Sequence, residues 1–201
     1  MDERPIIFSG PMVRAILAGK KTQTRRVVKP QPSPEYWQPP ILTEWYAPAV
    51  VRKGRQEPGP LQYGFANEEE GWRCPYGGPG DRLWVREAFD WVAGTSGGKR
   101  FNKTLFRADG GKPVTGKWTA SLFMPRWASR ITLAITDVRV QRVQEISHKD
   151  ALAEGVEYDV SQARGSPLCR FQQLWDALNA KRGFSWESNP WVWVITFSVV
   201  R

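Results

Sequence analysis

The segment Trp191-Val-Trp-Val-Ile-Thr-Phe-Ser-Val-Val200 decides how this chain of 201 residues folds. Large apolar side chains stand at every odd position from 191 to 197, and Val192 and Val194 add apolar side chains between them. Successive side chains of a strand point to opposite faces of its sheet, so both faces of this strand are expected to be buried. The pattern therefore predicts a central strand, with the remaining elements arranged around it.

Further extended segments are expected on either side of this strand. Strand-like composition marks residues 4–9, residues 22–28 and residues 82–89. Apolar residues alternate from Ile131 to Ile135, and the alternation then shifts by one residue to Val138 and Val140. A shift of this kind is what a β-bulge produces, and bulges are common in barrels.

Three short helices complete the expected elements. The first begins near Pro11 and ends at Gly19, and the second begins at Ser147 and ends at Gly155. Apolar residues at helical spacing over residues 168–178 predict a third, amphipathic helix. Strands near both ends and few helices predict an α+β fold, a closed or nearly closed mixed β-barrel with helices packed at its ends.

The chain is expected to form a single domain over residues 1–201, because no internal repeat or linker interrupts it. Two irregular insertions stand out, at about 35–70 and at 94–116. The first is rich in Pro, Gly and Trp and is interpreted as long loops with short strands, with a lid over the site as a hypothesis. The second is rich in Gly and Lys and is expected to form an exposed hairpin or loop.

The formal net charge of +9 favours an anionic partner, most simply RNA or DNA. A basic surface that keeps the protein soluble without any partner is the alternative. No stretch approaches the roughly 20 apolar residues of a membrane span, and the N-terminus lacks the apolar core of a signal peptide. We therefore expect a cytoplasmic protein without a membrane partner, with Cys74 and Cys169 as free thiols.

Several kinds of catalytic site are disfavoured by the residues present. The sole histidine, His148, lies in a helix-start pattern, where a surface position is expected. One histidine and two distant cysteines do not form a convincing zinc set, and the pattern of zinc nucleobase deaminases is missing. The glycines at 77–80 match neither phosphate-binding glycine motif. An enzyme with this sequence is therefore expected to work without a zinc ion or a histidine base.

Residues 19–26, Gly-Lys-Lys-Thr-Gln-Thr-Arg-Arg, carry the main functional signal. If the segment is extended, Thr24 and Arg26 share a face, and the flexible Lys21 at its start can reach Thr24. A lysine with a lowered pKa can take the proton of a threonine hydroxyl, and burial beside other cations lowers that pKa. The alternative is a basic strand that binds phosphates, with threonines present for strand propensity.

Gly19, Lys21 and Arg26 fit the Gly-x-Lys-x-x-x-x-Arg signature of the ASCH family, which this sequence resembles. Other stretches that resemble larger bacterial and prophage members are residues 5–8, 80–87, 129–131 and 151–155 and the closing Trp-Val-Trp-Val strand. The insertions at 35–70 and 94–116 lie outside the resemblance. Membership in this family implies a PUA-like β-barrel.

The resemblance also implies an activity, because some ASCH proteins are similar to small amidohydrolases that remove the acetyl group from N4-acetylcytidine. Their Lys, Thr and Glu triad falls here on Lys21, Thr24 and Glu154, the last in the Ala-Leu-Ala-Glu-Gly stretch. Glu87 and Glu145 are the fallback glutamates, because the intervening lengths differ from those of the small enzymes. The alternative for Glu154 is a solvent-facing carboxylate near a helix end.

The implied reaction is hydrolysis of the exocyclic amide of an N4-acylated cytosine nucleoside by this triad, and it needs no metal or organic cofactor. Arg26, or backbone N–H groups near the end of the first helix, would stabilise the oxyanion, while Trp84 and Arg82 are expected to bind the substrate. Modified cytidine or RNA is the expected partner, and the oligomeric state is left open. The alternatives are a noncatalytic RNA-binding module and, less favoured, a ribonuclease.

Overall fold

The computed structural model describes residues 2–33, 42–46, 50–52, 55–57, 61–66, 71–96, 99–157 and 165–200. The strands are β1 (Glu3–Ile7), β2 (Gln23–Val27), β3 (Thr43–Tyr46), β4 (Val50–Arg52), β5 (Arg55–Glu57), β6 (Leu61–Ala66), β7 (Gly71–Arg73), β8 (Arg82–Arg86), β9 (Phe89–Ser96), β10 (Lys99–Phe106), β11 (Thr132–Arg142) and β12 (Trp191–Val200). The helices are α1 (Gly10–Leu17), α2 (His148–Ala153) and α3 (Pro167–Asn179), with short 3-10 turns η1 (Arg107–Asp109), η2 (Ser121–Phe123), η3 (Arg126–Ala128), η4 (Val143–Glu145) and η6 (Ala180–Arg182).

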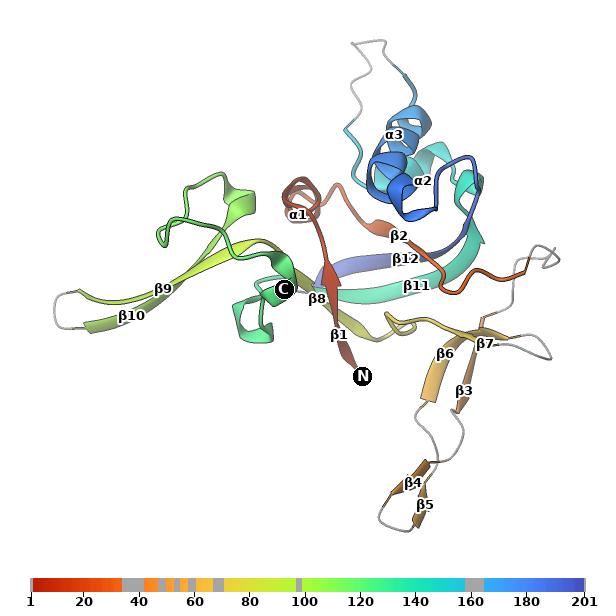
Figure 1. Ribbon diagram of the computed structural model, residues 1–201, viewed down its shortest axis with the longest axis horizontal. Coiled ribbons are helices and arrows are strands. Elements are labelled where there is room, and N and C mark those ends of the chain that lie inside the picture. Colours follow the sequence, from red (N-terminus) through yellow and green to blue (C-terminus); the bar gives the residue numbers. More distant parts are fainter. Residues whose placement is uncertain are drawn as a thin grey trace.

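A five-stranded sheet forms the centre of the fold, in the order β1-β8-β11-β12-β2 (Figure 1). β1 pairs with β8 in parallel, and the other neighbours pair antiparallel. β12 is hydrogen-bonded on both sides, to β11 and to β2. The predicted α+β class is confirmed, with a mixed sheet and with the last strand of the chain, β12, in its interior.

Both faces of β12 are buried, as its sequence predicts. Trp193 and Ile195 belong to the larger apolar cluster on one face of the sheet, together with residues of β8 and β11. Val192 and Val194 belong to a second cluster on the other face, where Phe171 and Trp175 of α3 pack over them. Helices α2 and α3 therefore cover one face of the sheet beside β2 (Figure 1).

The expectation of a closed barrel is wrong for the described residues. β1 and β2 are the two edges of the five-stranded sheet, and no backbone ladder in the described chain joins them. The gap is spanned instead by a side chain, since Arg26 Nη2 donates to the Ile7 carbonyl oxygen over 2.7 Å. The Arg26 guanidinium also lies over the Phe8 ring, 5.1 Å from its centroid, so contacts of the Arg26 side chain link β2 to the end of β1.

The local signals in the sequence are confirmed at the element ends. The register of β11 against β12 shifts between Ile135 and Asp137, which is the predicted bulge. Ser147 caps α2 by accepting a hydrogen bond from the Asp150 amide. Gly19 and Gly155 take positive φ angles of 70° and 79° just after their helices, a conformation that favours glycine.

The first insertion contributes to the core. Of residues 35–70, the described parts form strands β3 to β6; β3 and β6 join β7 in a small sheet, and β4 and β5 form a ribbon. Phe65 of β6 stacks on Trp72 of β7 at 4.9 Å and contacts Trp193 at 5.4 Å. The lid hypothesis concerns a segment that lies partly outside the described residues.

The second insertion is an extended hairpin. β9 and β10 pair antiparallel from Phe89 to Phe106 and form a two-stranded sheet of their own, which projects from the body of the protein (Figure 1). This confirms the exposed hairpin expected within residues 94–116. No helix in the described part of the chain combines the length and the apolar character needed to cross a membrane.

Candidate active site

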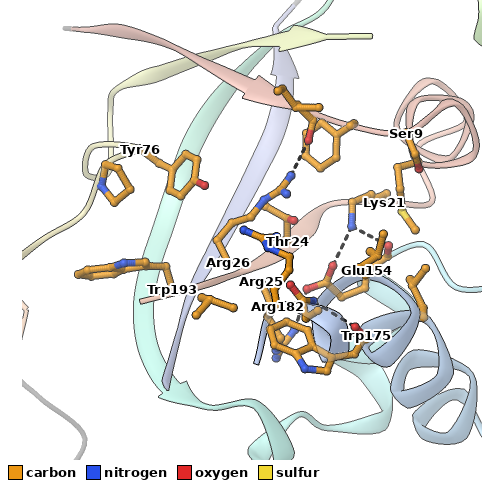
Figure 2. A pocket seen from close by; sticks show the side chains of 18 of the residues that line it. Ser9, Lys21, Thr24, Arg25, Arg26, Tyr76, Glu154, Trp175, Arg182 and Trp193 are labelled. Carbon is orange, nitrogen blue, oxygen red and sulfur yellow. Dashed lines mark hydrogen bonds and ion pairs between the residues drawn. The ribbon is translucent and has the colours of Figure 1, made fainter. Parts of the chain in front are cut away.

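A cavity of about 700 Å³ lies between β2, the start of α1, α3 and the turn that follows β7 (Figure 2). Its volume is in the range of small-molecule sites. The residues that give it chemical character are Lys21, Thr24, Arg26, Tyr76, Glu154 and Trp175. Four of the site residues predicted from the sequence therefore border one cavity, namely Lys21, Thr24, Arg26 and Glu154.

Lys21 and Glu154 are joined by two kinds of contact. Their backbones form an isolated antiparallel bridge, although they are far apart in sequence. Lys21 Nζ donates to Glu154 Oε2 over 2.8 Å and to the Glu154 carbonyl oxygen over 2.7 Å (Figure 2). The two residues are only 3% and 4% exposed, so the pair is removed from bulk water. The interpretation of Glu154 as a solvent-facing carboxylate is thus wrong.

The glycine after α2 makes this approach possible. A Cβ atom on Gly155 would lie 2.9 Å from Lys21 Cβ and 3.0 Å from Ala15 Cβ. Distances this short are not tolerated between carbon atoms, so only glycine lets α2 end against Lys21. The same residue that ends the helix by its positive φ therefore also fixes the position of the lysine.

Arg25 is a site residue that the predicted Lys, Thr and Glu triad does not include. Its Nη1 donates to Glu154 Oε1 over 3.2 Å, and its Nη2 pairs with Asp150 Oδ2 over 3.2 Å. Asp150 accepts a further bond from Arg139 Nη2 over 2.9 Å. Glu154 is therefore held by two cations, and one of them is fixed in turn by a carboxylate on α2.

The pKa of Lys21 is lowered, and burial is the main cause. The charge and hydrogen bond of Glu154 oppose this effect, while the charges of Arg26 and Arg25 add to it. The Phe8 ring, centred 5.7 Å from Nζ, contributes to the apolar surroundings of the amine. Burial and neighbouring cations thus act on this lysine in the direction that the sequence analysis anticipates.

Thr24 and Arg26 share the pocket with Lys21. Thr24 is 4% exposed and pairs through its backbone with Ile195 of β12, which fixes its place in β2. Figure 2 shows the Thr24 and Lys21 side chains at the same cavity. Among the described residues, no hydrogen bond joins Lys21 Nζ directly to the Thr24 hydroxyl, so the amine is engaged with Glu154 alone.

Trp84 and Arg82 do not line the cavity. In β8 the side chains of Leu83 and Val85 enter the core, so Trp84 and Arg82 fall on the opposite face of the strand. There the Trp84 ring lies 4.7 Å from the Arg86 guanidinium. The aromatic side chains that border the cavity include Tyr76, Trp175 and Trp193, and the sequence offered only its high tryptophan content as a signal for them.

Both fallback glutamates have other partners. The Glu87 carboxylate is 2% exposed and pairs with Arg130 Nε over 2.9 Å, outside the cavity. Glu145 accepts from the Arg142 backbone amide over 3.1 Å at the start of η4. The geometry therefore favours Glu154 over either alternative as the carboxylate beside Lys21.

The histidine and the two cysteines do not line the cavity. His148 is exposed at the first position of α2, as expected. Cys74 and Cys169 are both free thiols, which confirms the prediction, and burial raises the pKa of Cys74 to about 11. The described residues contain no group of three or more His, Cys, Asp or Glu side chains placed to hold a metal ion.

Comparison with known proteins gives two distant structural likenesses. No family model matches the sequence, and no curated protein matches it. One similar structure is an ASCH domain from Lactobacillus crispatus JV V101, at 12% identity and a TM-score of 0.40, covering 98% of this chain and 79% of that one. The other is protein EF3133 from Enterococcus faecalis V583, of family DUF984, at 12% identity and a TM-score of 0.37, covering 100% of this chain and 80% of that one.

Proposed function

We propose that this chain is an amidohydrolase that removes the acyl group from N4-acetylcytidine or a related N4-acylated cytosine compound. One observation carries the proposal, namely a buried lysine amine 2.8 Å from a buried carboxylate at the edge of a cavity that a threonine also borders. The ASCH-like signature at residues 19–26 supports the same reading, because it supplies both the lysine and the threonine.

Lys21 acts as the base in this proposal. A neutral amine has two N–H groups and one lone pair, and both N–H groups can donate to Glu154 at the contacts that Nζ makes. The lone pair is then free to take the proton of the Thr24 hydroxyl once the substrate has bound. Catalytic hydrogen bonds often tighten only in the substrate complex, so the engaged amine is compatible with this role.

The chemistry proceeds in two halves. The Thr24 oxygen attacks the acyl carbonyl carbon, the C–N bond breaks, and the proton held by Lys21 passes with the help of Glu154 to the departing cytosine amine. Water then hydrolyses the Thr24 ester and releases the carboxylic acid. The net reaction consumes one water and yields cytidine and the acid.

Arg26 and the aromatic lining supply the remaining functions. Arg26 uses one N–H group on the Ile7 carbonyl oxygen, and its other donors remain for the oxyanion that forms on the acyl group. Tyr76 is the half-buried aromatic residue among those that border the cavity, so its ring offers a flat apolar surface for a pyrimidine, whereas Trp175 and Trp193 are only 3% and 1% exposed. Tyr76 replaces Trp84 as the proposed base-binding residue.

An absorbance assay on free N4-acetylcytidine tests the proposal. We expect turnover to cytidine by the wild type and its loss, by about a hundredfold or more, in Lys21→Ala and Thr24→Ala. Lys20→Ala is the matched control, because Lys20 is the exposed neighbour of Lys21 and does not line the cavity. Unchanged turnover in Thr24→Ala, with the fold verified by circular dichroism, would contradict the mechanism.

An RNA-binding module without catalysis is the second candidate, favoured by the net charge and by exposed basic residues at the cavity. Such a module should bind RNA with an affinity that falls steeply as salt is raised. Its binding should respond to Arg26→Ala but not to Thr24→Ser. Salt-dependent binding without hydrolysis of the nucleoside would favour this candidate, and shortening of labelled RNA would favour a ribonuclease.

A further inference from the structure

The cavity carries more positive charge than its chemistry uses. Among its described lining residues are six basic side chains and one carboxylate, Glu154. Lys21 and Arg25 contact that carboxylate, and Arg26 donates to the Ile7 carbonyl oxygen. The other three basic residues are Lys29, Arg73 and Arg182.

Lys29, Arg73 and Arg182 form the cationic rim of the cavity. All three are exposed, and within the described chain none of them makes an ion pair with a carboxylate. They come from three separate segments, the end of the β2 region, β7 and η6, so no local repeat of basic residues explains their gathering. Like charges that border one cavity repel one another, and a bound anion would offset that repulsion.

Tyr76 helps to locate the rim. Burial raises the pKa of the Tyr76 phenol, and the charges of Arg26 and Arg182 act on it in the opposite direction. The charges of two guanidinium groups, from β2 and from η6, therefore act on one hydroxyl that borders the cavity. The phenol adds a hydrogen-bond donor beside these cations.

We propose that the cationic rim is a phosphate subsite, so that the substrate is a phosphorylated N4-acylcytidine rather than the free nucleoside. This inference rests on the proposed amidohydrolase function. Arginine and lysine are the usual partners of phosphate oxygens, arginine through paired N–H groups. Glu154, the carboxylate that could repel a phosphate, is already held by Lys21 and Arg25.

Paired kinetics on N4-acetylcytidine and its 5′-monophosphate test the subsite. We expect Arg73→Ala and Arg182→Ala each to raise KM for the monophosphate about tenfold, as for a lost charge-assisted hydrogen bond, and to leave KM for the nucleoside unchanged. Lys112→Ala is the matched control, because it removes an exposed cation that does not line the cavity. The preference for the monophosphate should also shrink as salt is raised.

Two further arms separate the possible outcomes. A short oligoribonucleotide with one internal N4-acetylcytidine shows whether the phosphate belongs to an RNA chain or to a free nucleotide. Faster turnover of the oligoribonucleotide or of the monophosphate than of the nucleoside supports the subsite. Binding of CMP and cytidine, followed by tryptophan fluorescence, is independent of catalysis. Tighter CMP binding that depends on Arg182, without hydrolysis of any substrate, would keep the subsite and reject the amidohydrolase. Equal efficiency on nucleoside and monophosphate, unaffected by the arginine variants, would overturn the subsite alone.

Discussion

Glu154 receives hydrogen bonds from two cations, Lys21 and Arg25, and the lysine is the one that can release a proton at a pH below the ordinary pKa of its side chain. Arginine keeps its proton under all ordinary conditions, so Arg25 remains charged. Lys21 is buried, and its pKa is lowered. Arg25 can therefore continue to balance the Glu154 charge while Lys21 becomes neutral. In the proposed mechanism, this division of roles lets Lys21 act as the base although a carboxylate lies beside it.

The pH dependence of catalysis follows from that balance. We expect kcat/KM to rise with pH and to level off below about 10.4, the ordinary pKa of lysine. Glu154→Gln removes the charge that raises the Lys21 pKa, so the inflection should move to lower pH while the maximal rate falls. A pH–rate profile of both proteins measures this shift, and an inflection at the same pH in the variant would contradict it.

Stability should depend on pH in the same direction. Between the lowered pKa of folded Lys21 and the ordinary value, the unfolded chain binds a proton that the folded chain has released. The free energy of unfolding contributed by this residue therefore rises with pH across that window.

Some site residues were predictable and others were not, for physical reasons. Lys21 and Thr24 share a short segment, so spacing alone relates them, and Glu154 came from the family resemblance. The Arg25 partners Glu154 and Asp150 lie 129 and 125 residues away, and no local pattern encodes such a pairing. The alternation of side chains along a strand puts Trp84 and Leu83 on opposite faces of the sheet. It does not indicate which of the two faces carries the cavity.

At the scale of elements, the end of α2 performs two tasks at one glycine. Gly155 reverses the chain with a φ of 79°, and its missing side chain makes room for Lys21. Gly183 has a similar φ of 84°, but a Cβ atom there would meet no heavy atom within 4 Å. The two glycines therefore differ in crowding and hardly at all in backbone conformation.

Gly155→Ala and Gly183→Ala form a matched pair. Each should lose about 1–2 kcal/mol of stability from the left-handed conformation alone. Gly155→Ala should lose more, because the new methyl group displaces Lys21, and its kcat should fall while Gly183→Ala keeps full activity. Thermal denaturation and kinetics on the acylated nucleoside measure both effects. Equal activity in the two variants would show that the glycine serves only to end the helix.

The elements themselves were largely predictable where strong local signals exist. The Ser147 cap, the glycine helix ends and the bulge after Ile135 each follow from one or two residues with a specific backbone preference. The strands of the first insertion carry no sustained alternation, and sequence analysis could assign only short strand pieces there. Their order is set by contacts such as Phe65 with Trp72, which composition does not reveal.

At the scale of the whole molecule, stability should be concentrated around β12. β12 is hydrogen-bonded to a strand on each side and is buried on both faces over most of its length. β9 and β10 instead form a two-stranded sheet that is hydrogen-bonded to the rest of the described chain only near its base, through the Phe89–Thr119 bridge and the Asp90 side chain. We expect amide hydrogens of β11 and β12 to exchange only through global unfolding and those of the β9–β10 hairpin to exchange much faster. Hydrogen exchange followed by mass spectrometry checks this, and equal protection would contradict it.

Closure of the sheet could not be predicted. Strand patterns indicate how many strands exist and which of their faces are buried. They do not indicate whether the two edge strands of the sheet, here β1 and β2, pair with each other. Here contacts of the Arg26 side chain link the two edges, and a guanidinium bond to the Ile7 carbonyl oxygen takes the place of a ladder. The open edge is also where the cavity lies, because Ile7, Phe8 and Arg26 all border it.

The Lys21–Glu154 contact joins residues 133 positions apart, and this separation has a consequence for how the protein acquires activity. Contacts between distant residues raise the contact order and form only after costly loop closure. Thr24 is held in register by Ile195, near the far end of the chain. A partly folded intermediate without β12 would thus lack a working centre, and enzymatic turnover would report completion of the entire tertiary structure.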